Sequence, residues 1–111
     1  ANDVAFSQDG LKIAVACTDG TRVYDVESGK EEQHLTEEVG FESRECVDWS
    51  PDGFIADGSR AGKLRVWDTK TWTLISTFQH CAGVSSVVFD DNGVLYASSY
   101  AGEANVFHRD T

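Results

Sequence analysis

Serine, histidine and aspartate residues are scattered along the chain, and these residue types make up a hydrolytic triad. His80 could act as the base of such a triad. Its acid would be Asp19, Asp57 or Asp90, and its nucleophile one of several serines. The sequence contains no G-x-S-x-G segment and no strand-to-helix elbow that would expose such a serine. We therefore expect no catalytic residues, and we interpret His80 as a structural histidine bonded inside the fold.

The other histidines and one acidic turn could be imagined as metal ligands. His34 and His108 each stand alone, without a second histidine at ligand spacing. The segment DDNG at Asp90–Gly93 lacks the alternating acids and the distal glutamate of a calcium loop. We interpret DDNG as a hairpin turn, and we expect no metal site and no cofactor.

The cysteines bear on both reactivity and compartment. Cys17, Cys46 and Cys81 are far apart and form no C-x-x-C pair, which argues against zinc. Cys17 lies in an apolar stretch and Cys46 begins another, so both are expected to be unreactive core thiols, whereas Cys81 lies in a loop. An odd number of dispersed thiols fits a reducing, intracellular compartment, either cytoplasmic or nuclear.

Charge argues against one large class of partner. Nine Lys and Arg residues face nineteen Asp and Glu residues, for a net charge of −10. Because binding to phosphates needs clustered positive charge, direct nucleic-acid binding is not expected. No apolar run approaches the roughly 18 residues that span a bilayer, so no membrane partner is expected. The chain has no Met, and we expect a processed chain or a piece of a longer one.

The elements that would position these residues repeat along the chain. Three segments align in register: VAFSQDG at Val4–Gly10, VDWSPDG at Val47–Gly53 and VVFDDNG at Val87–Gly93. An aromatic residue stands 14 positions after each closing glycine: Tyr24, Trp67 and Phe107. The period is 43 residues and then 40, which is typical of a repeat architecture.

Each repeat unit is expected to form antiparallel strands. Short apolar stretches, rich in Val, Ile and aromatic residues, are separated by Asp-Gly or Asn-Gly turns. In the first unit these stretches are VAFS, KIAVACT and TRVYDV, with EEQHLT as a fourth, and in the second unit TLISTF takes that fourth place. Nothing has a helical period over a useful length. Four strands in about 40 residues predict the blade of a propeller.

The three units resemble WD repeats over nearly the whole chain. The second unit, VDWSPDGFIADGSRAGKLRVWD, is the closest and carries the signature pair Trp67-Asp68. The resemblance implies an all-β fold, part of a β-propeller of three four-stranded antiparallel blades. The blades would be residues 1–40, 41–80 and 81–111, the last one incomplete. Three blades do not close a ring, so the expected partners include the remaining blades of the same propeller or a second copy.

The resemblance also implies a polar network in each blade. In the family, the tryptophan of the third strand donates its ring N–H to a Ser or Thr, which leads through a His to a turn Asp. Asp19 matches that turn Asp, but Ala61 and Ala101 replace it in the later units. The candidate structural residues are those at matching positions: Asp19, Ser59, Trp67, Asp68, His80 and Ser99. No unit has all four members, so we expect these blades to depend more on packing.

Function follows from the resemblance as an expectation. Such propellers serve as rigid platforms, which implies a non-enzymatic protein–protein interaction scaffold that docks partner proteins in a larger complex. The alternative is a propeller-based enzyme or a small-ligand site completed by the missing blades. In the family, the loops that enter the first strand and join the second and third strands line one rim. The matching positions are Asn2, Thr18, Arg44, Glu45, Arg60, Ser85 and Tyr100.

Two features could contribute to docking. Arg60 and Tyr100 are of the residue types enriched at interface hot spots. The densest charge lies from Glu27 to Asp48, where eight acids face Lys30 and Arg44. Charge on the outer strand of a blade opposes edge-to-edge aggregation, so a solvated strand and loop is one interpretation. The other is a docking patch for a basic segment of a partner.

Overall fold

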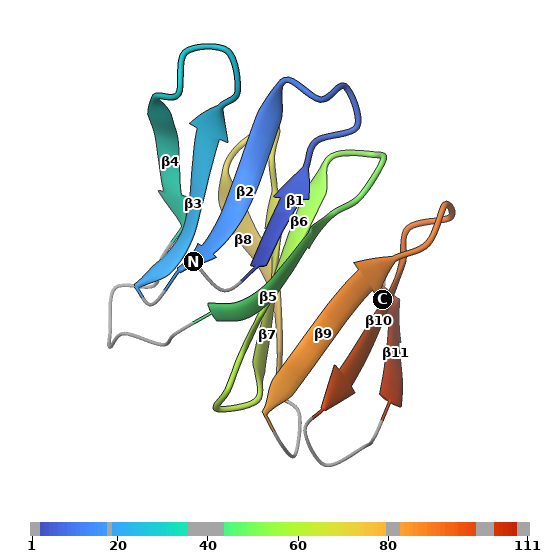
Figure 1. Ribbon diagram of the computed structural model, residues 1–111. Coiled ribbons are helices and arrows are strands. Elements are labelled where there is room, and N and C mark those ends of the chain that lie inside the picture. The colour runs from blue at the N-terminus through green and yellow to red at the C-terminus, as the bar shows by residue number, and fades with distance from the viewer. Residues whose placement is uncertain (1–2, 18, 36–43, 80–82, 100–103, 109–111) are drawn as a thin grey trace.

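The computed structural model describes residues 3–17, 19–35, 44–79, 83–99 and 104–108, and the account that follows concerns those residues. Their regular structure consists of β-strands arranged in three antiparallel sheets, which we call blades 1, 2 and 3 (Figure 1). No helix in those ranges is long and apolar enough to cross a membrane. The all-β blade architecture expected from the repeat is confirmed.

The three sheets follow the order of the chain. Blade 1 has the order β1-β2-β3-β4, with strands Asp3–Phe6, Lys12–Cys17, Gly20–Asp25 and Glu31–Leu35. Blade 2 has the order β5-β6-β7-β8, with strands Arg44–Trp49, Phe54–Ser59, Lys63–Asp68 and Thr73–Gln79. Blade 3 has the order β11-β10-β9, with β9 at Val84–Phe89, β10 at Val94–Ser99 and β11 at Ala104–His108. The bounds of the three repeat units stay a prediction.

Blade 2 lies between the other two and buries both of its faces. Side chains alternate along β7, so Leu64 and Val66 face blade 3 while Arg65 and Trp67 face blade 1. The cluster between blades 1 and 2 contains Ala14, Ala16, Val23, Leu35, Val47, Ile55 and Trp67. The cluster between blades 2 and 3 contains Cys46, Ala56, Leu64, Val66, Val84, Val87, Phe89, Leu95 and Ala97. Trp67 is 6% exposed, so the signature aromatic is a core residue.

A glycine sets the separation between blades 2 and 3. A Cβ atom on Gly58 of β6 would lie 2.5 Å from Cγ1 of Val84 on β9 and 2.9 Å from Sγ of Cys46. Such distances are well inside van der Waals contact, so any larger residue at this position would push β9 away. Gly58 therefore allows the two sheets to pack closely.

Carboxylates also join the first strands of successive blades. β1, β5 and β9 lie side by side, and each is an edge strand of its own sheet (Figure 1). Oδ2 of Asp3 accepts a hydrogen bond of 3.2 Å from the backbone N–H of Val47 on β5. Oδ2 of Asp48 accepts one of 2.7 Å from the N–H of Phe89 on β9. β5 and β9 therefore each donate a backbone N–H to a carboxylate of the preceding blade.

The outward faces of the two end blades are apolar in part. On β1, Val4 and Phe6 are exposed. On blade 3, Val88, Tyr96 and Val106 are exposed, and Tyr96 pairs directly with each of the other two across the sheet. These three side chains form one row over three strands. Both end faces thus have the character of a surface that another blade covers in a closed ring.

Candidate interaction rim and the network beneath it

The expected rim lies at one end of the blades. The β6–β7 turn and the start of β9 are at the same, lower end in Figure 1. Arg60 is exposed in that turn. On β9, the hydroxyl of Ser85 donates to the backbone oxygen of Ser98 at 3.2 Å and lies 3.1 Å from its hydroxyl. The structure therefore places Arg60 and Ser85 at this end, as an interaction rim would require.

The other expected rim residues are described less fully or not at all. Arg44 and Glu45 are the first two residues of β5. Asn2, Thr18 and Tyr100 lie outside the described residues, as do His80 and Cys81. The hypothesis that these positions bind a partner therefore stays a prediction.

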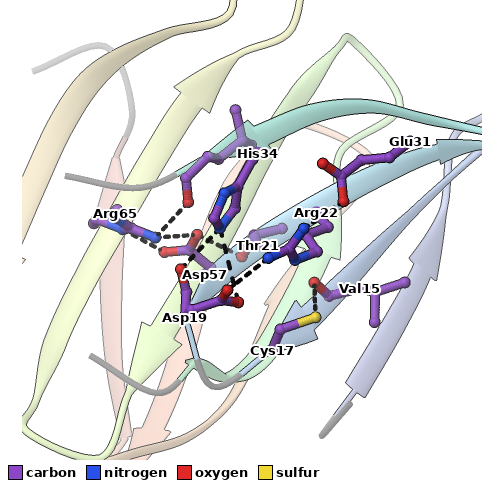
Figure 2. Close-up of polar contacts among 10 residues, drawn as sticks. Val15, Cys17, Asp19, Thr21, Arg22, Glu31, His34, Asp57 and Arg65 are labelled. Atoms are coloured by element: carbon purple, nitrogen blue, oxygen red, sulfur yellow. Dashed lines mark hydrogen bonds and ion pairs between the residues drawn. The ribbon is translucent and has the colours of Figure 1, made fainter. Parts of the chain in front are cut away.

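A charged cluster on blade 1 surrounds the turn residue Asp19 (Figure 2). Nη2 of Arg22 lies 2.5 Å from Oδ2 of Asp19, and Nη1 of the same side chain lies 2.6 Å from Oε1 of Glu31. His34 donates from Nε2 to the backbone oxygen of Asp19 at 2.9 Å. The hydrogen bond from Arg22 lowers the pKa of Asp19, so this carboxyl stays ionised at neutral pH. Because the cluster is partly exposed, its ion pairs contribute little to stability.

Two acids of the Glu27–Asp48 segment are engaged in ion pairs on this blade. Besides Glu31, Glu32 on β4 pairs with the ammonium of Lys12 on β2. The hydrogen bond to Glu32 raises the pKa of Lys12. Part of the negative charge of this segment is therefore balanced within blade 1, while residues 36–43 lie outside the described ranges.

A second cation and acid form an ion pair in the interior between blades 1 and 2. Arg65 on β7 lies directly across from Asp57 on β6. Nε of Arg65 donates to Oδ1 of Asp57 at 2.8 Å, and Nη2 donates to Oδ2 at 2.9 Å. Arg65 is 2% exposed and Asp57 is fully buried. Two parallel bonds satisfy the carboxylate at both oxygens, which is the geometry that a buried pair needs.

Further donors complete this buried network and connect the two blades. The hydroxyl of Thr21, on β3 of blade 1, donates to Oδ2 of Asp57 at 2.7 Å. Nη2 of Arg65 also donates to the backbone oxygen of Leu35 on β4, at 3.3 Å. The guanidinium carbon lies 5.0 Å from the centre of the Trp67 ring, within the range of a cation–π contact. A single carboxylate thus organises side chains from two blades (Figure 2).

The ring N–H of Trp67 finds its acceptor in this network. Nε1 donates to Oδ2 of Asp57 at 3.3 Å. The family pattern instead leads from the tryptophan to a turn Asp, and Ala61 stands at that position here. In blade 2 the acid therefore sits in the second strand, two residue pairs along the sheet from the indole. Reasoning from the family motif missed this arrangement, because Asp57 lies outside the motif.

The remaining structural candidates have local roles at the described turns. Ser59 is buried, and its hydroxyl accepts a hydrogen bond of 3.0 Å from the backbone N–H of Lys63 across the β6–β7 turn. Asp68 accepts a hydrogen bond of 2.8 Å from the N–H of Lys70 and so holds the β7–β8 turn. Ser99 is buried at the end of β10. Ser59 and Asp68 thus stabilise turns, and Ser99 belongs to the buried interior.

The two cations occupy equivalent places in their blades. Arg22 precedes Val23 and Tyr24 as Arg65 precedes Val66 and Trp67. The strand residue opposite Arg22 is Val15, whereas the residue opposite Arg65 is Asp57. Arg22 therefore takes its acid from the turn and from β4, on an open face. The arginine is common to both blades; the pair of blade 2 is buried because blade 1 covers it, whereas the pair of blade 1 lies on an end face.

Two of the three cysteines, Cys17 and Cys46, lie in the described part of the chain. Cys46 is 2% exposed within the cluster between blades 2 and 3, and Cys17 is half-buried on β2 with its Sγ 3.6 Å from the backbone oxygen of Val15. In the part of the chain that the structure describes, no three His, Cys, Asp or Glu side chains gather as metal ligands do.

Comparison with known proteins supports the repeat. Residues 33–68 match the family described as WD domain, G-beta repeat. The U3 small nucleolar RNA-associated protein 4 homolog of Homo sapiens is 29% identical over 113 residues, which cover 95% of this chain and 16% of that protein. The homolog of the same name in Mus musculus is 29% identical over 111 residues, covering 89% of this chain and 16% of that protein. The chain thus spans 16% of the length of these curated relatives, and the resemblance to WD repeats is confirmed.

Proposed function

We propose that this chain, which is built of WD repeats, forms part of a non-enzymatic platform that docks partner proteins within a larger complex. The observation that carries the proposal is the alignment of 95% of the chain with a protein named for its association with U3 small nucleolar RNA. The geometry is consistent with this role, since the sheets are packed against one another, turns lie at both ends, and the buried network joins two blades.

Rigidity between blades supports the platform role. A docking surface that spans several blades keeps its shape only if the blades do not move relative to one another. The bond from Thr21 of blade 1 to Asp57 of blade 2 is fully buried. On the other side of blade 2, the missing side chain of Gly58 lets Val84 approach closely. These contacts hold the three blades in one arrangement below the rim that carries Arg60.

The relatives' name suggests the kind of complex and its compartment. We propose that the complete protein belongs to a nuclear assembly that is associated with a small nucleolar RNA. The chain's net charge of −10 opposes direct binding to phosphates. Contact with RNA would then pass through partner proteins that dock on the propeller.

The test is co-purification from cells that express the tagged full-length protein. We expect partner proteins and U3 small nucleolar RNA to be recovered with the wild type, and both to be reduced by Arg60→Ala. The matched control is Lys70→Ala, which removes an exposed cation from the β7–β8 turn at the opposite end. Thermal melting of both variants separates lost docking from lost folding.

Two outcomes would contradict the proposal. Recovery of neither proteins nor small nucleolar RNA with the wild type would remove the platform role. Equal recovery with the wild type and with Arg60→Ala would remove this rim and direct attention to the acidic segment from Glu27 to Asp48. Ultraviolet cross-linking of the RNA to this protein itself would show direct contact, against the expectation from its charge.

A further inference from the structure

A cavity lies between blades 1 and 2 at the end opposite the proposed rim. Its volume is about 440 Å³, which is within the range of small-ligand sites. Three turns form its walls: the β1–β2 turn of blade 1, and the β5–β6 and β7–β8 turns of blade 2. In Figure 1 the β1–β2 and β5–β6 turns lie side by side at the upper end. The cavity is therefore separate from Arg60 and its neighbours.

One wall of the cavity is a tryptophan with an unusual backbone. Trp72 has a φ of 58°, in the left-handed region that bulky residues avoid. The equivalent residue of blade 1 is Gly29, with a φ of 72°. The turn thus needs a left-handed residue, and blade 2 supplies it with an indole in place of the glycine that would adopt it without strain. Strain of this kind at a half-buried turn residue points to a role for the side chain.

A second tryptophan of the lining is also specific to blade 2. Trp49 ends β5 and lies opposite Ile55 of β6. Phenylalanine takes the same place in the other two blades, as Phe6 of β1 against β2 and as Phe89 of β9 against β10. The fold therefore needs only an aromatic ring at this position. What blade 2 adds at both places is an indole N–H, a donor that phenylalanine and glycine side chains lack.

The two indoles are held in fixed positions by their neighbours. The rings of Trp72 and Trp49 meet edge to face, with centroids 6.4 Å apart and an interplanar angle of 84°. Thr69 donates to the backbone oxygen of Gly53 from both its N–H, at 3.1 Å, and its hydroxyl, at 2.7 Å. These bonds fasten the β7–β8 turn to the β5–β6 turn, so the two rings form a preorganised corner.

The ring N–H groups of this corner have no protein acceptor among the described residues. Trp67 shows the contrast, because its ring N–H donates to Asp57. Trp49 and Trp72 contact each other through their rings, and neither ring donates to an acceptor within the described ranges. Both side chains are half-buried, so their faces and donors keep surface available to a ligand.

The charged side chains of the lining have partners within the chain. Asp9 accepts a hydrogen bond of 3.0 Å from the N–H of Leu11. That bond and the charge of Lys12 lower the pKa of Asp9, and Nζ of Lys12 also pairs with Glu32 of β4. Oδ1 of Asp52 accepts from a serine hydroxyl of its own turn at 2.7 Å. Since none of these charges lies unpaired, the lining favours a neutral ligand over an ion.

A neutral ligand that suits two indoles combines apolar rings with free hydrogen-bond acceptors. The carbonyl groups of helices and sheets are already paired, whereas a polyproline II helix makes no internal hydrogen bonds and leaves its carbonyl oxygens free. We propose that the cavity binds a proline-rich segment of a partner protein in this conformation. A pyrrolidine ring packs on an indole face, and a carbonyl oxygen of the segment accepts from an indole N–H. Indoles also stack on bases, but the net charge of −10 disfavours a phosphate backbone.

This inference stands apart from the proposed function. It concerns the opposite end of the blades, and it would hold for any partner that brings an exposed proline-rich segment. Failure of the peptide experiment would leave the rim with Arg60 untouched. Loss of docking at that rim would likewise leave the cavity proposal intact.

The test uses the full-length protein labelled with 5-fluorotryptophan and read by fluorine NMR. Trp49→Phe, Trp67→Phe and Trp72→Phe identify the resonances of these three residues. The probe is acetylated and amidated hexaproline, compared with an alternating Gly-Ala hexapeptide that is neutral and flexible. We expect hexaproline to shift the resonances of Trp49 and Trp72 in a saturable way and to leave that of the buried Trp67 in place. The Gly-Ala peptide should not bind.

Variants separate the contribution of the ring from that of its donor. Trp72→Gly removes the indole and relieves the backbone strain, and we expect it to abolish saturable binding, read at Trp49, without lowering the melting temperature. Trp72→Phe keeps an apolar ring without the N–H, and we expect binding to weaken roughly three- to tenfold, the effect of one neutral hydrogen bond. Lys70→Ala changes an exposed residue of the same turn that does not line the cavity, and it should bind as the wild type does.

The salt dependence tests whether recognition is neutral. We expect the affinity for hexaproline to change by less than about twofold between low salt and about 1 M salt, where exposed charges are screened. A steep loss of affinity with salt would show recognition through charge and would contradict the proposal.

Other outcomes would overturn the proposal. Absence of a saturable shift with hexaproline would do so, and so would equal shifts with hexaproline and the Gly-Ala peptide. Unchanged binding in Trp72→Gly would remove the indole corner as the site. Titrations with the capped tripeptide Gly-Phe-Gly and with oligouridylate provide the competing ligands. Shifts of Trp49 and Trp72 with either of these and not with hexaproline would assign the cavity to an aromatic side chain or to single-stranded nucleic acid instead.

Discussion

Arg65 holds the carboxylate of Asp57 at two points across neighbouring strands, and both side chains are buried between blades 1 and 2. Removing one member leaves the other charged and buried, which costs far more than the pair itself contributes. We expect Asp57→Ala to lower the free energy of unfolding of the full-length protein by about 3–5 kcal/mol. Urea denaturation measures this loss, with Asp91→Ala as an exposed control. A loss under about 1 kcal/mol would mean that water reaches Arg65.

The indole of Trp67 contributes both packing and one hydrogen bond. We expect Trp67→Ala to cost about 3–5 kcal/mol, because it leaves a large cavity between blades 1 and 2. Trp67→Phe keeps most of the ring and removes the donor to Asp57, and it should cost about 1 kcal/mol. Denaturant melts of both variants separate the two contributions. Equal losses of stability in Trp67→Ala and Trp67→Phe would show that the hydrogen bond contributes more to stability than the packing of the ring does.

Gly58 is expected to tolerate no side chain. Gly58→Ala places a methyl group against Val84, so the free energy of unfolding should fall by about 1–3 kcal/mol. Val84→Ala alone should also destabilise, by the loss of a buried aliphatic group. In the variant that carries both Gly58→Ala and Val84→Ala, the smaller side chain at position 84 leaves room for the added methyl group. We therefore expect its loss in the free energy of unfolding to be smaller than the sum of the two single losses. Additive losses in this double-mutant cycle would show that β9 moves away instead.

The pH dependence of stability should reflect Asp48. Burial raises the pKa of Asp48, and the nearby charge of Asp3 adds to this effect. A raised folded-state pKa makes a contribution to stability that is present below the unfolded pKa and lost as the pH rises through the folded value. Asp48→Asn keeps an acceptor for the N–H of Phe89 and does not titrate. We expect the variant to be more stable than the wild type at neutral pH.

The difference in stability between the wild type and Asp48→Asn should shrink as the pH falls toward 3.8, the ordinary pKa of this carboxyl. Thermal melts of wild type and Asp48→Asn across this range provide the measurement. Asp9, Asp19 and Asp25 have lowered pKa values and destabilise both proteins in acid, so their effect cancels in the difference. A difference that does not change with pH would show that Asp48 is not the titrating group.

The repeat period predicted most of the fold. The aligned Val4–Gly10 and Val47–Gly53 segments fixed the register of strand and turn, because a strand that slips by one residue would turn its apolar side chains to the wrong face. Alternation along β7 also placed Val66 and Trp67 on opposite faces. The burial of Trp67 followed from that pattern together with the family resemblance.

The buried network could not be predicted in the same way. Its contacts join Thr21 to Asp57 across 36 positions, and no periodic signal links them. One local signal was present: Asp57 and Arg65 are charged residues in the middle of their strands. Counting residues in both directions from the β6–β7 turn places them opposite each other. A charge at an inward position of a strand needs a partner, so this count would have found the pair.

The contact between Trp72 of the β7–β8 turn and Trp49 of β5 was missed for a different reason. In the sequence, Trp72 follows the signature pair by four residues, where the first unit has Gly29. The alignment of the two units therefore contained the exchange of glycine for tryptophan. Its meaning depends on the left-handed backbone and on the approach of Trp49, which are properties of the folded turn.

The bond between Thr21 and Asp57 has a consequence for how such repeats are inherited. A repeat whose core contacts stay within its own strands can be duplicated, deleted or exchanged as a module. Blade 2 cannot be transplanted in this way, because one donor to its buried carboxylate comes from blade 1. A recombination that separated the two blades would leave Asp57 with one donor fewer in the interior. Thr21 and Asp57 are therefore expected to change together during divergence.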